Sequence, residues 1–171
     1  MKRRALFLLA LSSFTPGCGY HPAGKANLLP ADLRTLAIPA FVNQTQTYRI
    51  EQMLTTGVAE EFARRTPYRI TSDAASADAV LHGAVLSSYT SPLTYDSKTG
   101  RAATVLVVVS MRVSLNDRLG HVLYQNPLYT FREQYQISQE LSSFFEEDSP
   151  AFERLSRQFA RSLVSNILEV F

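Results

Sequence analysis

The stretch ATVLVVVSMRVSL, residues 103–115, decides the fold class. It is rich in β-branched residues, apolar on both faces in its first half and alternating in its second half, which predicts a long strand because successive strand side chains point to opposite faces. One face is wholly apolar and is expected to be buried: Val105, Val107, Val109, Met111, Val113 and Leu115. The other face starts apolar and turns polar: Leu106, Val108, Ser110, Arg112 and Ser114. That second face is either covered within the domain or left as a partner surface.

The segments on either side of this strand predict its neighbours in the sheet. Downstream, a polar turn leads to a returning strand over Val122–Tyr135, which Pro127 is expected to break. Upstream, Ala79–Tyr89 predicts another strand, in which Gly83 indicates a bulge or a close backbone approach. Residues 90–101 are expected to form the loop that joins this upstream strand to the long strand.

The N-terminal half adds a short strand and a helix. Leu33–Val42 is an apolar run of strand formers, and Pro39 within it indicates an edge position or a bulge. Over Tyr48–Arg65 the apolar residues recur at helical spacing: Ile50, Met53, Leu54, Val58 and Phe62. The pairs Glu60/Arg64 and Glu61/Arg65 are four residues apart and are expected on a solvated outer face.

A second helix closes the chain. Asp148-Ser149-Pro150 is typical of a helix start, because a capping side chain precedes a proline in the first turn. Apolar residues then follow one face: Phe152, Leu155, Phe159, Leu163, Ile167 and Val170. A polar face carries Arg154, Arg157 and Arg161, which serve solubility or contact an anionic lipid or a partner. The chain is therefore predicted to be an α+β two-layer sandwich, with an approximately four-stranded mixed sheet and two helices packed on one face.

The first 17 residues have the layout of a signal peptide. Lys2-Arg3-Arg4 precede a short apolar run, which is well below the roughly 20 residues of a membrane span. Cys18 is the only cysteine and follows this leader directly, as in a bacterial lipobox, where the thiol is acylated and anchors the protein in lipid. An ordinary signal-peptidase cut without lipidation is the alternative. Residues 18–30 are expected to form a tether, and residues 31–171 one domain.

Charge and motif content exclude several function classes. The chain has 17 basic and 15 acidic residues, and without residues 1–17 it has 14 and 15, a net charge of −1. This balance lacks the basic field of nucleic-acid binders, so no nucleic-acid partner is expected. The three histidines have no metal-ligand spacing, and no catalytic motif or cofactor fingerprint is present. We therefore expect a binding or assembly module without metal, cofactor or enzymatic activity, in which Asp73 and Asp78 act as caps.

One loop carries a candidate binding site. Lys98 and Arg101 lie in the loop before the long strand, with Tyr95 nearby. Such a tip suits a phosphate flanked by apolar chains, because the two cations meet the anion while the aromatic ring meets the lipid. An ordinary polar hairpin loop explains the same residues equally simply.

Several segments together resemble the LptE family of lipopolysaccharide-assembly lipoproteins. They are CGYH at residues 18–21, LPADLRTLAIPAFVNQTQ at 29–46, RIEQMLTTGVAEEFARR at 49–65, ADAVLHGAV at 77–85, VSLNDRLGHVLY at 113–124 and the C-terminal helix. The resemblance implies an α+β sandwich that is held at the periplasmic face of the outer membrane by lipid on Cys18. It also implies a plug inside the LptD β-barrel that helps to assemble this barrel and to deliver lipopolysaccharide, with no enzymatic activity.

The resemblance also implies particular lipopolysaccharide contacts. In the family, basic residues near the loop between the second and third strands make them, and Lys98 and Arg101 occupy that region here. A further basic position is expected before the closing helix, but residues 136–148 contain no Lys or Arg. The alternative function is a generic lipid-anchored periplasmic module that binds another envelope protein or a glycan through the same sheet.

Overall fold

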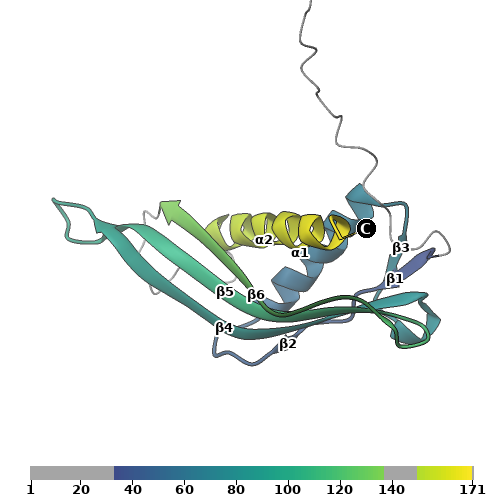
Figure 1. Cartoon of the computed structure of the whole chain (residues 1–171). Coiled ribbons are helices and arrows are strands. Elements are labelled where there is room, and N and C mark those ends of the chain that lie inside the picture. Colours follow the sequence, from purple (N-terminus) through teal and green to yellow (C-terminus); the bar gives the residue numbers. More distant parts are fainter. Residues whose placement is uncertain (1–32, 137–149, 171) are drawn as a thin grey trace, which may run out of the picture.

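The computed structural model describes residues 33–136 and 150–170, which form a helical layer over one sheet (Figure 1). Three long strands dominate the sheet and pair antiparallel: β4 (Ala79–Tyr95), β5 (Ala102–Asp117) and β6 (Val122–Gln136). Three short strands join through parallel pairing: β1 (Thr35–Ala37), β2 (Val42–Asn43) and β3 (Arg69–Thr71). The order is β3-β1-β4-β5-β6, with β2 also paired to β4.

The α+β class and the mixed sheet are confirmed, but six strands replace the approximately four predicted. The run Leu33–Val42 is not one strand, because the backbone between β1 and β2, where Pro39 lies, leaves the ladder. Pairing with β1 also turns the short extended segment at Arg69–Thr71 into a strand. A one-turn 3-10 helix, η1 (Ala74–Ser76), connects β3 to β4.

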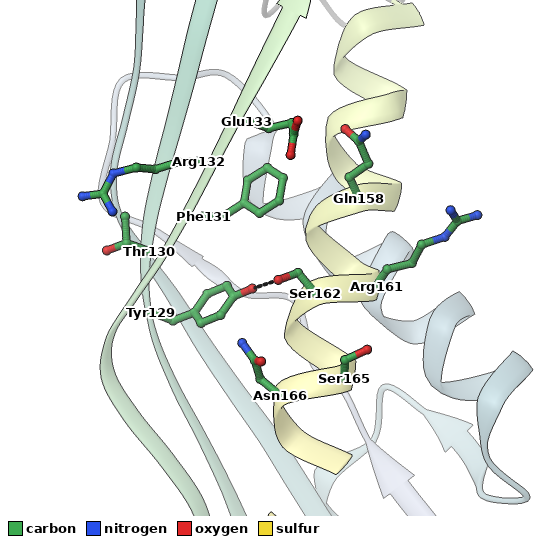
Figure 2. Close-up of a pocket in the computed structure, with 10 residues that line it drawn as sticks. All are labelled: Tyr129, Thr130, Phe131, Arg132, Glu133, Gln158, Arg161, Ser162, Ser165 and Asn166. Atoms are coloured by element: carbon green, nitrogen blue, oxygen red, sulfur yellow. Dashed lines mark hydrogen bonds between the residues drawn. The ribbon is translucent and has the colours of Figure 1, made fainter. Parts of the chain in front are cut away.

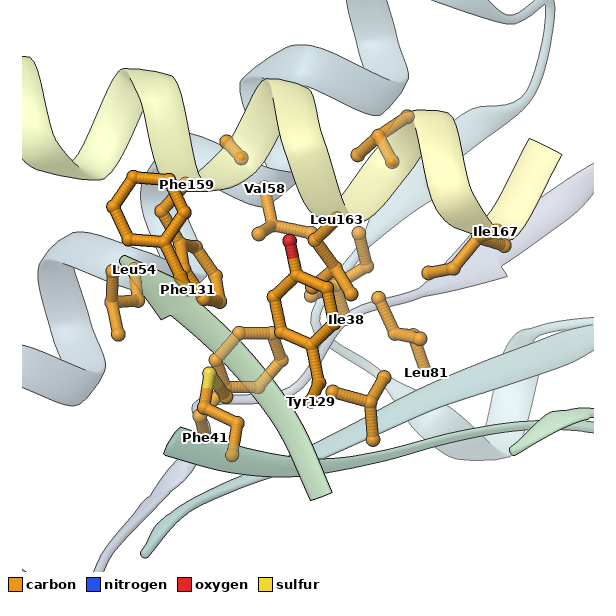
Figure 3. Packing of buried hydrophobic residues seen from close by; sticks show 14 of the residues in the cluster. Ile38, Phe41, Leu54, Val58, Leu81, Tyr129, Phe131, Phe159, Leu163 and Ile167 are labelled. Atoms are coloured by element: carbon orange, nitrogen blue, oxygen red, sulfur yellow. The ribbon is translucent and has the colours of Figure 1, made fainter. Parts of the chain in front are cut away.

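Two helices cover one face of the sheet: α1 (Ile50–Arg65) and α2 (Pro150–Leu168) (Figure 1). The predicted apolar stripe of α1 is buried at four of its five positions: Ile50, Leu54, Val58 and Phe62. From α2, Phe152, Leu155, Phe159, Leu163 and Ile167 are buried as predicted. They share one core with the apolar face of β5, from Val105 to Leu115, which is wholly buried. Figure 3 shows Phe159, Leu163 and Ile167 of α2 pointing towards the sheet. Burial of this face of β5 stabilises the fold by about 1.5–3 kcal/mol for each large aliphatic side chain.

Two predictions about the helix surfaces are wrong. Glu61 does not lie on a solvated face: it is only 4% exposed and pairs with Arg64 and with Arg65, whose guanidinium lies 3.9 Å away. Gly57 and Arg65, one turn before and after Glu61, contact Ser156 and Ser165 of α2, so Glu61 lies on the side of α1 that faces the second helix. The spacing within one helix cannot reveal this. Val170 is 62% exposed, because α2 ends at Leu168 before the apolar stripe reaches it.

Two predictions about where strands stop at a proline-containing segment are also wrong. Residues 90–95 are not loop: β4 continues through Pro92 to Tyr95, and the bulge between Pro92 and Thr94 accommodates the missing N–H donor. Pro127 does not break β6. The ladder instead shifts register there, so that Pro127 and Leu128 both lie opposite Arg112 as a bulge. Both prolines therefore bend a continuous ribbon rather than end it.

Candidate functional site

The predicted cationic site lies at the tip of the β4–β5 hairpin, which extends beyond the helical layer (Figure 1). Lys98 and Arg101 are both exposed and sit on one short turn. Tyr95, at the end of β4, is 62% exposed beside them. The structure therefore brings the three predicted residues together, on a surface that nothing else in the described chain covers.

The shape of this turn is set by Asp96. One carboxylate oxygen of Asp96 accepts hydrogen bonds from the backbone N–H of Lys98 at 3.0 Å and of Thr99 at 2.7 Å, and from the Thr99 hydroxyl at 2.9 Å. These bonds hold the pKa of Asp96 below its usual range. Gly100 closes the turn at φ +68°, a left-handed conformation that glycine adopts without strain. The loop is thus a built turn that presents Lys98 and Arg101 outward.

Two other parts of the predicted site lie outside the described residues. They are Cys18, the predicted lipid attachment, and the segment after Gln136, where the family pattern predicts a further basic position.

The face of β4, β5 and β6 that points away from the helices forms a larger candidate surface, here called the open face. The strand register places these cross-strand rows on it: His82–Ser114–Gln125, Ala84–Arg112, Ser87–Ser110–Thr130, Tyr89–Val108–Arg132, Ser91–Leu106–Gln134 and Thr94–Thr104–Gln136. Figure 2 shows Thr130 and Arg132 turned away from α2, whereas Tyr129, Phe131 and Glu133 point towards it. No described helix covers this face, so of the two alternatives for the outer side of the long strand, the structure favours the uncovered one.

Hydroxyl, amide and cationic side chains dominate the open face. Its rows contain two exposed arginines, Arg112 and Arg132, and none of them contains a carboxylate. Val108 is nevertheless 2% exposed, because its row neighbours Tyr89 and Arg132 flank it on either side. Alternation within β5 predicts that Arg112 lies on this face, but the alignment with Arg132 depends on the bulge in β6 and could not be read from spacing.

A groove of about 640 Å³ lies on the other side of the sheet edge, between β6 and α2 (Figure 2). Sequence reasoning missed it. The Tyr129 hydroxyl and Ser162 Oγ are 2.8 Å apart across it, and the Tyr135 hydroxyl donates to Gln158 Oε1. Below these bonds the rings of Tyr129 and Phe131 meet Phe159 edge-on, with centroids 5.7 and 5.8 Å apart. Hydrogen bonds and ring contacts therefore join the edge strand β6 to the helix α2 along the floor of the groove.

Burial raises the pKa of both tyrosines that bond α2, Tyr129 in the groove and Tyr135 beyond it. For Tyr129 the hydrogen bond to Ser162 only partly offsets this effect. For Tyr135 the nearby Glu133 carboxylate raises the pKa further. Both phenols are therefore neutral at physiological pH, and they act as hydrogen-bonding side chains of the interface rather than as acids or bases.

Asp73 and Asp78 have structural roles. Asp73 caps η1 by accepting from the backbone N–H of Ala75 at 3.0 Å. Asp78 accepts from the backbone N–H groups of Arg34 and Thr35 and pairs with Arg118 at 2.5 Å. The prediction that these aspartates act as caps is therefore confirmed for Asp73 and extended to a strand junction for Asp78.

Two searches of the described residues were negative. No group of three or more potential ligands could hold a metal ion within residues 33–136 and 150–170. Neither α1 nor α2 is both long and apolar enough to cross a membrane.

A family model described as LptE, lipopolysaccharide-assembly, matches residues 33–167, which span both helices and the whole sheet. The chain belongs to the LptE family. The match confirms the resemblance seen in the sequence and assigns the protein to lipopolysaccharide assembly, in a family of envelope lipoproteins without known catalysis. Among curated proteins, none matches the sequence.

Solved structures support the same fold for this LptE-family chain. Protein CT253 from Chlamydia trachomatis is 10% identical, with a TM-score of 0.53 over 80% of this chain and 96% of that one. The PelC dodecamer from Paraburkholderia phytofirmans is 20% identical, with a TM-score of 0.50 over 84% and 94%. Protein XCC0632 from Xanthomonas campestris is 14% identical, with a TM-score of 0.50 over 82% and 89%. At these identities the likeness concerns the fold alone.

Proposed function

We propose that this chain is an outer-membrane lipoprotein that plugs an LptD-type β-barrel, helps this barrel to assemble and takes part in delivering lipopolysaccharide to the outer leaflet. In this proposal residues 1–17 are removed as a signal peptide. Cys18 is then acylated, residues 18–30 form the tether, and residues 31–171 form the domain at the periplasmic face. The observation that carries the proposal is the family match over residues 33–167.

The geometry fits such a role in two ways. The open face leaves a long ribbon of three strands available to a partner that surrounds the domain. The hairpin tip extends beyond the helices and presents Lys98 and Arg101 together with the exposed ring of Tyr95. A cationic and aromatic tip suits the phosphate groups and acyl chains of lipopolysaccharide, because each part of the ligand meets a side chain of matching chemistry.

The proposal is tested first by a pull-down of the tagged full-length protein from its own outer membranes in mild detergent. We expect a large β-barrel in a fixed ratio to the bait, together with lipopolysaccharide detected in the same eluate. Depletion of the chain should reduce the amount of mature barrel. Absence of any barrel from the eluate, with normal barrel maturation on depletion, would favour the generic lipid-anchored module.

The anchor is tested separately by metabolic labelling with an alkyne fatty acid. Wild type should incorporate the label and sediment with membranes, and Cys18→Ser should do neither, because a single thiol carries the acyl group. Equal labelling of both proteins would refute acylation at Cys18.

A further inference from the structure

The open face carries positive charge that the described chain does not neutralise. Arg112 and Arg132 are both exposed, and no carboxylate within residues 33–136 and 150–170 pairs with either guanidinium. Elsewhere on the surface arginines do have acidic partners, such as Arg118 with Asp78 and Arg157 with Glu153. Arg69, Arg154 and Arg161 also have no acidic partner among the described ion pairs, so what sets the open face apart is that its rows hold two arginines and no carboxylate.

The two arginines are spaced along the ribbon. Arg132 lies opposite Val108, and Arg112 is four residues further along β5, which places the two positions about 14 Å apart. The row between them consists of hydroxyls, Ser87, Ser110 and Thr130, of which the last two lie 3.4 Å apart. Hydroxyls next to guanidinium groups add donors to a surface that already favours an anionic partner.

The apolar groups of the open face form no continuous strip. Leu106, Val108 and the half-exposed Tyr89 make one small cluster, and Val108 at its centre is already only 2% exposed. Leu128, 62% exposed in the bulge opposite Arg112, and Val42, 58% exposed next to Ala84, lie in other rows. This arrangement offers no continuous slot for an acyl chain. The open face has arginine and tyrosine but no lysine. Enrichment of arginine and tyrosine and depletion of lysine are typical of protein–protein interfaces. These observations favour a polypeptide over a lipid as the occupant.

We propose that the open face docks on a carboxylate-bearing polypeptide surface. Arg112 and Arg132 form ion pairs with this partner, and Tyr89 on β4 makes an aromatic contact with it. This inference rests on the proposed function, in which the occupant is the inner wall of the barrel partner. It predicts acidic residues on that wall at matching spacing. It also assigns barrel docking to the open face and leaves the hairpin tip for lipopolysaccharide.

The test compares three forms of the tagged full-length protein in the mild-detergent pull-down. They are wild type, Arg112→Glu/Arg132→Glu, and the control Arg157→Glu/Arg161→Glu, which makes the same charge change on exposed positions of α2 in the other layer. Thermal melts by circular dichroism show whether each variant is folded, and Arg112→Gln/Arg132→Gln serves as a milder variant. We expect barrel recovery to fall at least tenfold for the open-face variant and to stay near wild type for the control.

Each other outcome has a definite meaning. Equal barrel recovery by folded wild type and open-face variants overturns the inference and leaves the proposed function standing. Loss of lipopolysaccharide from the eluate with the barrel retained also overturns it, because the face would then take the glycolipid. Equal losses in the open-face and α2 variants reduce the effect to net charge and likewise refute it. No barrel with wild type refutes the proposed function and this inference together.

Discussion

The ring of Phe41 lies directly on the backbone of Gly83: a Cβ placed on Gly83 would be 2.6 Å from Cδ1 of the ring. Phe41 belongs to the segment between β1 and β2, and Gly83 belongs to β4, so this contact presses the connecting segment onto the sheet. Gly83 was predicted to mark a bulge or a close backbone approach, and the structure confirms the close approach. Gly83 does not have a positive φ angle, so its backbone conformation does not require glycine. Glycine is needed here because a side chain would collide with the ring.

We expect Gly83→Ala to lower the free energy of unfolding by about 1–3 kcal/mol, since an added methyl group overpacks a buried ring. Urea unfolding followed by circular dichroism measures this change. Phe41→Leu in the Gly83→Ala background should recover part of the loss by removing the ring edge. An alanine variant as stable as wild type would show that the ring moves away freely.

The bond between Tyr129 and Ser162 fixes the edge strand to the helix. Tyr129→Phe should cost about 1 kcal/mol of unfolding free energy, because it removes one partly buried hydrogen bond but keeps the ring against Phe159. A double-mutant cycle with Ser162→Ala measures the coupling between the two hydroxyls. Strictly additive losses in the double variant would contradict a direct bond.

Acid should weaken the junction at Asp78. The backbone N–H groups of Arg34 and Thr35, followed by the charge of Arg118, hold the pKa of this carboxylate below its usual range. The resulting stability is present above the unfolded pKa of about 3.9 and is lost as pH falls through the lower folded pKa. Melts between pH 2 and 6 should show a smaller acid dependence for Asp78→Asn than for wild type. Identical profiles would remove Asp78 from the acid response.

High pH should weaken the packing of α2 on β6 and so lower the stability of the fold. Because burial raises the pKa of Tyr129 and Tyr135, the folded state holds their protons at a pH where the unfolded chain releases them. Stability is therefore full below about pH 10 and falls as pH rises above it. Tyr135→Phe should flatten this decline in urea titrations at pH 9–11, whereas a change at the exposed Tyr48, Tyr48→Phe, should leave it unaltered.

The hairpin tip should contribute to lipopolysaccharide binding. Lys98→Glu/Arg101→Glu is expected to weaken binding of lipopolysaccharide to the purified protein at least fivefold, because two attractive charges become repulsive. Arg69→Glu/Arg157→Glu, on exposed positions outside the β4–β5 hairpin, makes the same charge change and should bind like wild type. Fluorescence titration at two salt concentrations measures both. Equal affinities for the two double variants would remove the tip from the binding site.

The parts of the fold that depend on local pattern were predictable, and those that depend on pairing were not. Alternation gave the buried face of β5 from Val105 to Leu115, and helical spacing gave Ile50 through Phe62. The burial of Glu61 and the course of β4 past Pro92 depend on contacts with distant segments, which no local spacing encodes. The same holds for the site: Lys98 and Arg101 are neighbours in sequence, whereas Arg112 and Arg132 are placed on one face of the sheet by the register of β5 with β6.

The bulge at Pro127 also affects how copies of this chain meet one another. Within the described residues β6 is the outermost long strand, and its free edge could recruit a strand from another molecule. Pro127 has no backbone N–H to donate, and the local twist of the bulge interrupts the flat run that an incoming strand would need. We therefore expect the bulge to disfavour edge-to-edge association between copies of this chain.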